Sequence, residues 1–171
     1  DDESFGLGGI IASLVAAGVP VDVLCFTHGE ASTLGRGAGV DLGRLRAAEL
    51  EAAGRVLGVE RTVLWGWPDG GLAACSLAEL TPPVADLVAE RSVDALLVFD
   101  ESGVTGHPDH RRATQVARRV ADRRGIAVYG WTVPDDVADR LNREFGTRFA
   151  GRPRHQLSWR VPVDRDRQRR A

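Results

Sequence analysis

The chain has 171 residues, of which 43% are hydrophobic, and this suffices for one globular domain with an ordinary core. Its formal net charge of −2 argues against a nucleic-acid-binding protein, which would carry an excess of basic residues. No apolar run is long enough to span a membrane, and no secretory signal opens the sequence. The two cysteines, Cys25 and Cys75, do not suggest a disulfide framework, so we expect a cytoplasmic protein.

Predicted helices and strands alternate along the first half of the chain. A helix of small residues is expected over residues 6–17, and a β-branched apolar strand over 19–26 follows it. The segment 42–57 carries one apolar stripe and precedes Gly58, which predicts a helix with a glycine stop. The next predicted strand covers 61–67.

The second half repeats this alternation. Residues 76–90 are expected to be helical in parts, with two adjacent prolines starting a fresh first turn. An apolar strand over 93–99, a helix over 109–124 and a strand over 126–133 follow. The remaining residues are expected to be irregular, apart from an edge strand over 157–163.

The alternation of strands and helices predicts the fold class. We expect an α/β fold with a Rossmann-like, doubly wound, mostly parallel sheet that has helices on both faces. Ligands of such sheets bind beyond the carboxyl ends of the strands. The residues expected at that edge are Asp1 and Asp2, 27–30, 67–70 and 100–110.

One domain is expected over residues 1–171, trimmed at both ends. Asp1 and Asp2 resemble residues that follow a strand, yet no strand precedes them in the sequence. The segment 164–171 resembles a helix that is cut near its beginning.

The stretch from Gly106 to His110 reads Gly-His-Pro-Asp-His and concentrates groups that bind metals and transfer protons. Pro108 suits the first turn of a helix, so His107 would lie just before that helix and His110 within its first turn. One imidazole could then bind a metal while the other faces a substrate. The alternative is that one histidine caps the helix and the other lies on the surface.

Asp1-Asp2-Glu3 supplies adjacent carboxylates at the other end of the chain. Such carboxylates repel each other unless a cation or a proton lies between them. One of them could bind a metal while its neighbour takes a proton from water. For this tripeptide alone, an acidic helix N-terminus that is stabilised by the helix dipole is the better interpretation.

Together, the two motifs resemble those of the PIG-L/LmbE-like family of zinc-dependent N-deacetylases, of the N-acetylglucosaminyl deacetylase type. Asp1-Asp2-Glu3 matches the last three residues of the family's His-Pro-Asp-Asp-Glu motif, and 106–110 matches its second motif in full. Further matches occur in the family's order over nearly the whole chain: Thr27-His28-Gly29-Glu30, Arg46 with Glu49, Leu57-Gly58-Val59 and Pro68-Asp69-Gly70-Gly71-Leu72.

The resemblance implies roles for individual residues. Asp2 and His110 would be zinc ligands, together with a histidine that the family places before Asp1. Asp1 would be the general base, His107 would donate a proton or hydrogen bond to the oxyanion and the leaving amine, and Asp109 would orient His107. Two imidazoles and one carboxylate leave an open zinc position, as a catalytic site requires.

The residues that the resemblance implies for binding sugar hydroxyls are Glu30, Arg46 and Asp69. Surface charges and a turn aspartate are the alternative interpretation of these three.

We therefore predict an enzyme that uses Zn²⁺ and activated water to remove an acetyl group from an N-acetylglucosamine-containing small molecule. A related amidase acting on a thiol-sugar conjugate or an antibiotic precursor is one alternative, and a non-catalytic sugar-binding module of the same fold is another. The expected partner is a small amino-sugar substrate, with no nucleic acid and no membrane span. The sequence leaves a homo-oligomer open.

Overall fold

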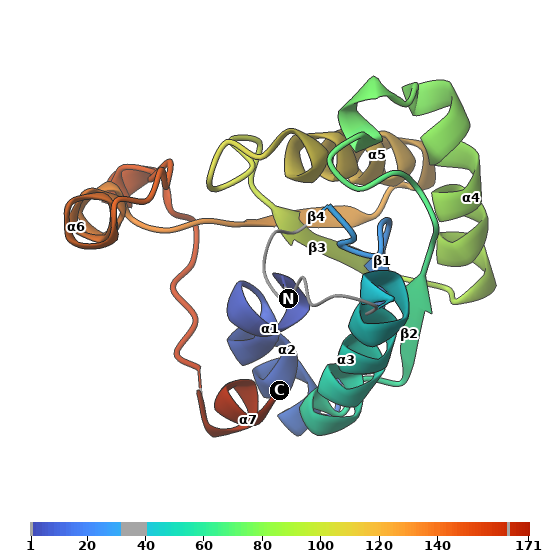
Figure 1. Cartoon of the computed structure of the whole chain (residues 1–171), viewed down its shortest axis with the longest axis horizontal. Helices are drawn as coiled ribbons and strands as arrows, with labels where there is room; N and C mark the ends of the chain where they lie inside the picture. Colours follow the sequence, from blue (N-terminus) through green and yellow to red (C-terminus); the bar gives the residue numbers. More distant parts are fainter. Residues whose placement is uncertain (1, 32–40, 164) are drawn as a thin grey trace. The chain divides into compact units, whose positions relative to one another are not determined.

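The computed structural model describes residues 2–31, 41–163 and 165–171, and these form two compact units of mixed α/β structure (Figure 1). The first unit comprises the residues up to Asp69 together with Arg160–Ala171, and the second comprises Gly70–Trp159. Each unit contains one pair of parallel strands, so the predicted α/β class is confirmed. The described strands hydrogen-bond as these two separate pairs, and the doubly wound sheet stays a prediction.

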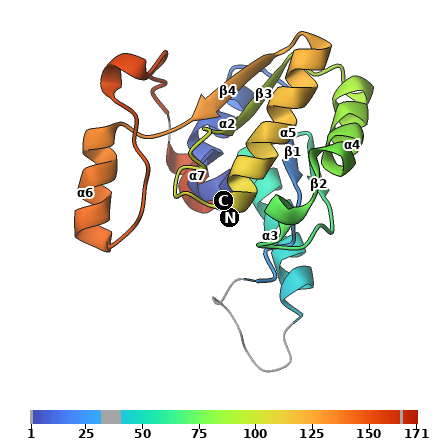
Figure 2. The ribbon, with the colours of Figure 1, turned by 90° about the horizontal axis from the view of Figure 1, so that it is seen from above.

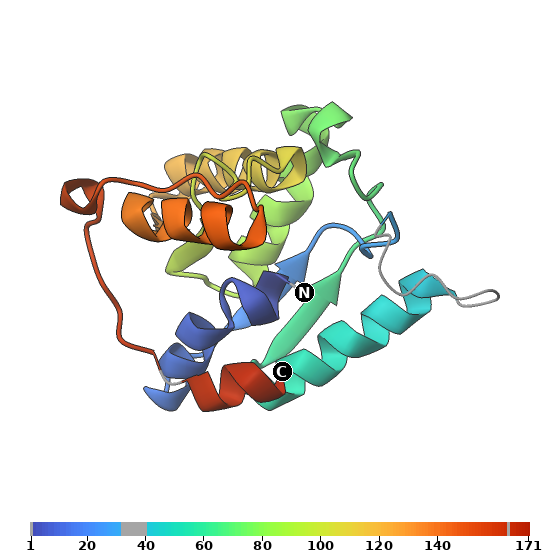
Figure 3. The ribbon, with the colours of Figure 1, turned by 60° about the vertical axis from the view of Figure 1, so that its left-hand side comes forward.

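The first unit consists of four helices and one strand pair among its described residues. Its elements are α1 (Asp2–Phe5), α2 (Gly8–Ala16), β1 (Asp22–Cys25), α3 (Leu42–Leu57), β2 (Arg61–Leu64) and α7 (Arg165–Arg170). Strand β1 pairs with β2 in parallel, and α3 lies on the connection between them (Figure 3). A small apolar core forms where α2 meets the end of α3: Ile11 and Ala12 pack with Leu57, which is fully buried.

Helix α3 has the bounds that the sequence predicts, because local signals define both of its ends. The Asp41 side chain accepts a hydrogen bond from the Arg44 N–H at 3.1 Å, which satisfies one of the unpaired donors of the first turn. At the other end Gly58 adopts φ 82°, a left-handed conformation that glycine reaches without a steric penalty.

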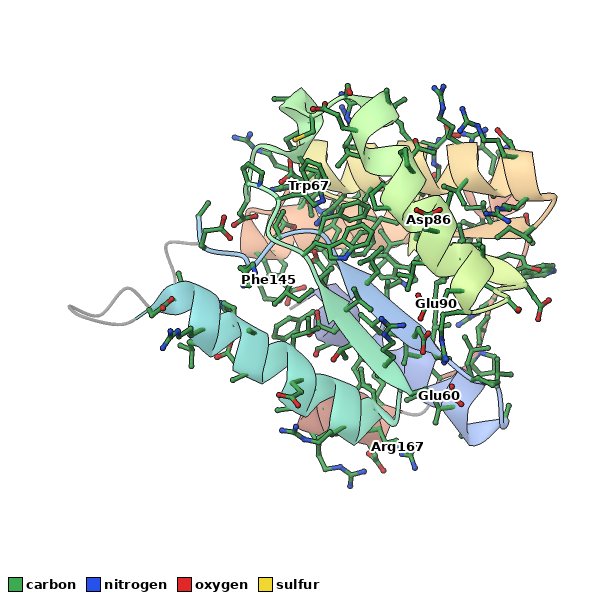
Figure 4. All side chains as sticks on the ribbon, turned by 90° about the vertical axis from the view of Figure 1, so that its right-hand side faces the viewer. Glu60, Trp67, Asp86, Glu90, Phe145 and Arg167 are labelled. Atoms are coloured by element: carbon green, nitrogen blue, oxygen red, sulfur yellow. The ribbon has the colours of Figure 1, made fainter. Side chains whose placement is uncertain are left out.

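Helix α7 packs against the rest of the first unit through its polar side chains. Gln168 Nε2 donates to the carbonyl oxygens of Ser4 (2.8 Å) and Phe5 (3.1 Å). Arg167 reaches the C-terminal end of α3 (Figure 4), where its Nη1 lies 3.5 Å from the Leu57 carbonyl oxygen. The helix predicted at the C-terminal end is therefore confirmed.

The edge strand predicted over 157–163 is wrong, because this segment has no strand pairing in the structure. Pro162 lies within it and has no N–H with which to join a strand ladder.

The second unit contains the remaining elements. They are η1 (Leu72–Ala74), α4 (Leu77–Glu90), β3 (Ala95–Phe99), α5 (Pro108–Arg124), β4 (Ala127–Trp131), α6 (Asp135–Phe145) and η2 (Arg154–Gln156), where η denotes a 3₁₀ turn. Strands β3 and β4 pair in parallel, and α5 connects them and lies along the pair (Figure 2). Val116 and Val120 of α5 are fully buried, so the apolar face of this helix forms much of the unit's core.

Two expectations for the second unit are wrong. Helix α4 runs unbroken through Pro82 and Pro83, although a proline inside a helix costs about 3 kcal/mol. A capping box at Ser76 and Glu79 and a stripe of buried residues offset that cost. Residues after 133 are expected to be irregular, but 135–145 form α6, which begins with Asp135 and Asp136 and ends at Gly146 in a left-handed conformation (φ 65°).

No helix in the described ranges is both long enough and apolar enough to cross a membrane.

The close contact between α3 and β2 yields the first testable prediction. A methyl group at Gly54 would lie 2.5 Å from Thr62 Cγ2 and 3.1 Å from Val59 Cγ2. We expect Gly54→Ala to lower the free energy of unfolding by about 1–2 kcal/mol, because overpacking outweighs the gain in helix propensity. Urea denaturation measures the change. Gly66→Ala is the matched control, since its added methyl would meet no described atom within 4 Å; equal stability of both variants would contradict the packing argument.

Candidate active site

The Gly-His-Pro-Asp-His motif lies at the start of α5, and the helix begins at Pro108 as the sequence predicts. His107 is the N-cap residue, and its Nδ1 accepts a hydrogen bond from the Asp109 main-chain N–H at 3.2 Å. Because this Nδ1 is an acceptor, a neutral His107 ring carries its proton on Nε2. His107 therefore caps the helix and at the same time presents a donor from an exposed position.

In His110 the Nδ1 atom is the donor of its hydrogen bond, whereas in His107 it is the acceptor. The His110 Nδ1 lies 3.1 Å from the Gly103 carbonyl oxygen, and since a carbonyl can only accept, Nδ1 carries the hydrogen. The ring stacks on Phe99 at the end of β3, with centroids 4.4 Å apart and planes at 28°. In the neutral ring the lone pair is consequently on Nε2. Such a histidine, with its other nitrogen bound to a backbone carbonyl, is the usual form of a zinc ligand.

The two rings are neighbours with complementary chemistry. Their centroids are 4.7 Å apart. One ring offers an N–H to an oxygen atom that gains negative charge, while the other offers a lone pair to a metal. His110 is thus one candidate zinc ligand within the second unit.

The Asp109 carboxylate is buried and organises the loop after Asp69. It accepts hydrogen bonds from the main-chain N–H groups of Gly70 (2.8 Å) and Ala73 (3.3 Å), and the residue is only 7% exposed. The contact between Asp109 and His107 is made by the Asp109 main chain. Orientation of His107 by Asp109 stays a prediction, and the geometry adds a second task for the carboxylate, which is to hold residues 70–73 against α5.

In the first unit, Glu30 and Asp69 lie together, in the segments that follow β1 and β2. Glu30 accepts a hydrogen bond from the Asp69 N–H at 3.1 Å. The Asp69 carboxylate in turn accepts from Thr27 Oγ1 at 3.3 Å and from the Ala31 N–H at 2.9 Å. Two of the three predicted sugar-binding residues therefore share one network. The third, Arg46, forms an ion pair with Glu49 at 2.9 Å.

The first motif is described only in part, because Asp1 lies outside the described residues. Asp2 and Glu3 belong to α1, where Glu3 is 5% exposed and accepts a hydrogen bond from Ser4 Oγ at 3.1 Å. Burial raises the pKa of the Cys25 thiol to about 12, and the charges of Glu3 and Asp2 act in the same direction. Among the described residues no group of three or more His, Cys, Asp or Glu side chains is arranged to hold a metal ion.

Two polar residues support the motif from within the second unit. Sequence reasoning places the first, Asp100, at the expected edge but gives it no role, and it misses the second, Arg152. Asp100 follows β3 directly and is 8% exposed, and its carboxylate pairs with Arg152 at 2.7 Å. The position of Asp100 after an apolar strand was a usable signal. Arg152 lies in an irregular segment and offers none.

The comparisons with known proteins agree with both motifs. The PIG-L family, described as GlcNAc-PI de-N-acetylase, matches residues 1–121. The chain belongs to this family. The matched range includes Asp1-Asp2-Glu3 and the whole of the second motif, so the resemblance inferred from these residues is confirmed.

Individual relatives are similar over most of the chain. The 1D-myo-inositol 2-acetamido-2-deoxy-alpha-D-glucopyranoside deacetylase of Saccharomonospora viridis is 34% identical over 97% of this chain and 69% of its own length. A Corynebacterium glutamicum protein of the same name is 31% identical over 79% of this chain and 53% of its own length. The solved structure of the A40926 pseudoaglycone deacetylase Dbv21 has a TM-score of 0.69 at 19% identity, covering 99% of this chain and 74% of that one, and shares the fold.

The chain spans between 53% and 69% of the length of these two curated relatives.

The raised pKa of Cys25 yields a prediction about reactivity. The thiolate is the reactive form, and a free cysteine has a pKa of about 8.5. In a Cys75→Ala variant, which leaves Cys25 as the only thiol, we expect iodoacetamide at pH 8 to react at least about 100-fold more slowly with the folded chain than with the urea-unfolded chain. Mass spectrometry follows the modification. Equal rates in the two states would contradict the raised pKa of this thiol.

Proposed function

We propose that the protein is a zinc-dependent deacetylase that hydrolyses the N-acetyl group of a small molecule containing N-acetylglucosamine. The observation that carries the proposal is the pair of neighbouring histidines at the start of α5, whose hydrogen bonds give them opposite ring tautomers. Membership of the PIG-L family supports it, as do the deacetylase names of the relatives.

Zinc would be held by Asp2 and His110, together with the histidine that the family carries before its aspartates. The hydrogen bond from His110 Nδ1 to Gly103 supports this assignment, because it directs the Nε2 lone pair to the metal. When bound, zinc polarises the amide carbonyl and lowers the pKa of water to about 7.

The other residues of the motifs handle protons. Asp1 takes a proton from water as the water oxygen bonds to the acetyl carbon. His107 donates a hydrogen bond from Nε2 to the oxyanion and assists departure of the amine. The carbon–nitrogen bond then breaks, the proton passes to the amine nitrogen, and acetate and the free amino sugar are released.

Specificity for the sugar would come from Glu30, Asp69 and Arg46. Two carboxylates and a guanidinium offer acceptors and donors that suit ring hydroxyl groups. The network that joins Glu30, Thr27 and Asp69 supports this assignment, because it holds the two acidic side chains in fixed positions.

We further propose a doubly wound Rossmann-like sheet, a single domain over 1–171 and a cytoplasmic location. A related amidase acting on a thiol-sugar conjugate or an antibiotic precursor is the main alternative, and acetate release from such substrates but not from N-acetylglucosaminyl-inositol would favour it.

The first test of the proposal concerns the metal. In a chain extended by the family's His-Pro before Asp1, we expect about one zinc per chain, and we expect His110→Ala to lose it because a ligand is removed. Elemental analysis measures the metal. The matched control is His155→Ala, an exposed histidine in η2 that should leave the zinc in place. A metal-free parent protein would refute the zinc mechanism.

The second test separates His107 from the metal. We expect His107→Ala in the same extended chain to retain its zinc but to lower acetate release by about 10²–10⁴-fold, the usual contribution of a positioned proton donor. Acetate is measured with N-acetylglucosaminyl-inositol as substrate. Turnover equal to that of the parent chain would remove His107 from the mechanism.

A further inference from the structure

The loop between β3 and α5 is strained. Gly103 and Gly106 have φ values of 72° and 78°, and Val104 between them has φ 63°. Positive φ is a steric outlier for a β-branched residue and is energetically unfavourable. Such a conformation persists only where surrounding contacts enforce it. Val104 is itself 3% exposed.

Asp100 holds the beginning of this loop. One oxygen of its carboxylate accepts hydrogen bonds from the Ser102 N–H at 3.1 Å and from Ser102 Oγ, and the other accepts from Arg152 Nε at 2.7 Å. The Asp100 carbonyl accepts from the Gly103 N–H at 2.9 Å. Burial alone would raise the pKa of Asp100, but the bonds from Ser102 and Arg152 outweigh it and lower the pKa below its usual value. The carboxylate therefore stays charged and keeps both partners.

A strap formed by Ala150–Arg152 holds the loop from outside. The Ala150 N–H donates to the Val104 carbonyl at 2.6 Å, while Arg152 binds Asp100. The strap is itself anchored, because the Arg152 N–H donates to Val133 and its carbonyl accepts from the Asp135 N–H, both at 2.9 Å. Gly151 lies so close to the start of α6 that an added methyl would overlap the Asp135 backbone.

The group that orients His110 lies in the middle of the loop. The Gly103 carbonyl, which receives the hydrogen of His110 Nδ1, lies between the two points where the strap contacts the loop, Asp100 and Val104. A methyl at Gly103 would come within 2.7 Å of the His107 carbonyl oxygen, so the backbone has little room to rotate. The Gly103 carbonyl also accepts a hydrogen bond from the Thr105 N–H at 2.7 Å, within the loop itself. The contacts of Asp100, Val104 and the strap hold the residues on either side of this carbonyl.

We propose that Arg152 is a positioning residue that, through Asp100 and the strained loop, fixes the proton of His110 on Nδ1 and so directs its Nε2 toward a metal. The consequence for catalysis rests on the proposed function, whereas the effect on the His110 ring does not. Arg152 lies beyond residues 1–121, the range that the family matches. The strap is thus a support for the motif from a part of the chain outside that match.

The tautomer of His110 tests the proposal without metal or substrate. The chain has four histidines, so ring ¹H–¹⁵N correlation spectra contain four sets of signals, and a His110→Gln variant assigns one of them. At pH 8.5, where a histidine of ordinary pKa is neutral, we expect the parent chain to show the Nδ1–H form of His110. We expect Arg152→Met, which keeps an unbranched side chain about as far as the position of Nε but removes the donors, to shift the ring to a mixture of tautomers.

Arg154→Met is the matched control. Arg154 lies two residues after Arg152, forms an exposed ion pair with Asp136, and has no described contact with the loop. The variant should leave the His110 signals unchanged. Asp100→Asn removes the charge at nearly constant shape, and it decides the question if Arg152→Met does not fold. A parent-like Nδ1–H tautomer in the folded variants would overturn the proposal.

Zinc affinity then tests the link to function. In the chain extended by His-Pro, we expect Arg152→Met to weaken zinc binding by about 10–100-fold, the usual effect of removing support from a metal ligand. A shifted tautomer with unchanged zinc affinity would keep the positioning role of Arg152 but contradict His110 as a ligand. An unshifted tautomer would overturn the inference whether or not the protein binds zinc.

Discussion

The candidate site depends on the hydrogen bond between His110 Nδ1 and the Gly103 carbonyl. This bond decides which nitrogen of the ring carries the lone pair, and only a lone pair directed outward can bind a metal. The neighbouring His107 receives the opposite tautomer from the Asp109 N–H. Two identical side chains three positions apart thus acquire different chemistry from the backbone groups around them.

Maintaining this arrangement requires a strained backbone, and the second unit supplies the contacts that enforce it. Val104 is held at φ 63° by hydrogen bonds to both of its backbone groups, from Ala150 to its carbonyl and from its N–H to Ser102 Oγ at 3.0 Å. The buried Asp109 carboxylate holds the loop after Asp69 in a similar way. Strain concentrated at a loop that orients a proposed ligand is typical of functional sites, because it preorganises the geometry.

Family membership and geometry contribute different parts of the functional argument. The PIG-L family identifies which residues to compare, and its match covers both motifs. A shared fold alone would not define a reaction, since one fold hosts many activities. The tautomers of the two histidines add a physical reason for assigning one ring to proton donation and the other to metal binding.

The sequence by itself determined the elements and motifs whose signals are local. Asp41 and Gly58 delimit α3, Pro108 starts α5, and the residues of both family motifs can be read directly. The tertiary structure alone decided the unbroken α4 and the pairing of Asp100 with Arg152, 52 positions away. The physical reason is that capping and turn preferences act within a few residues. Burial of a helix's apolar stripe, or formation of an ion pair, depends instead on which distant segments fold against these residues.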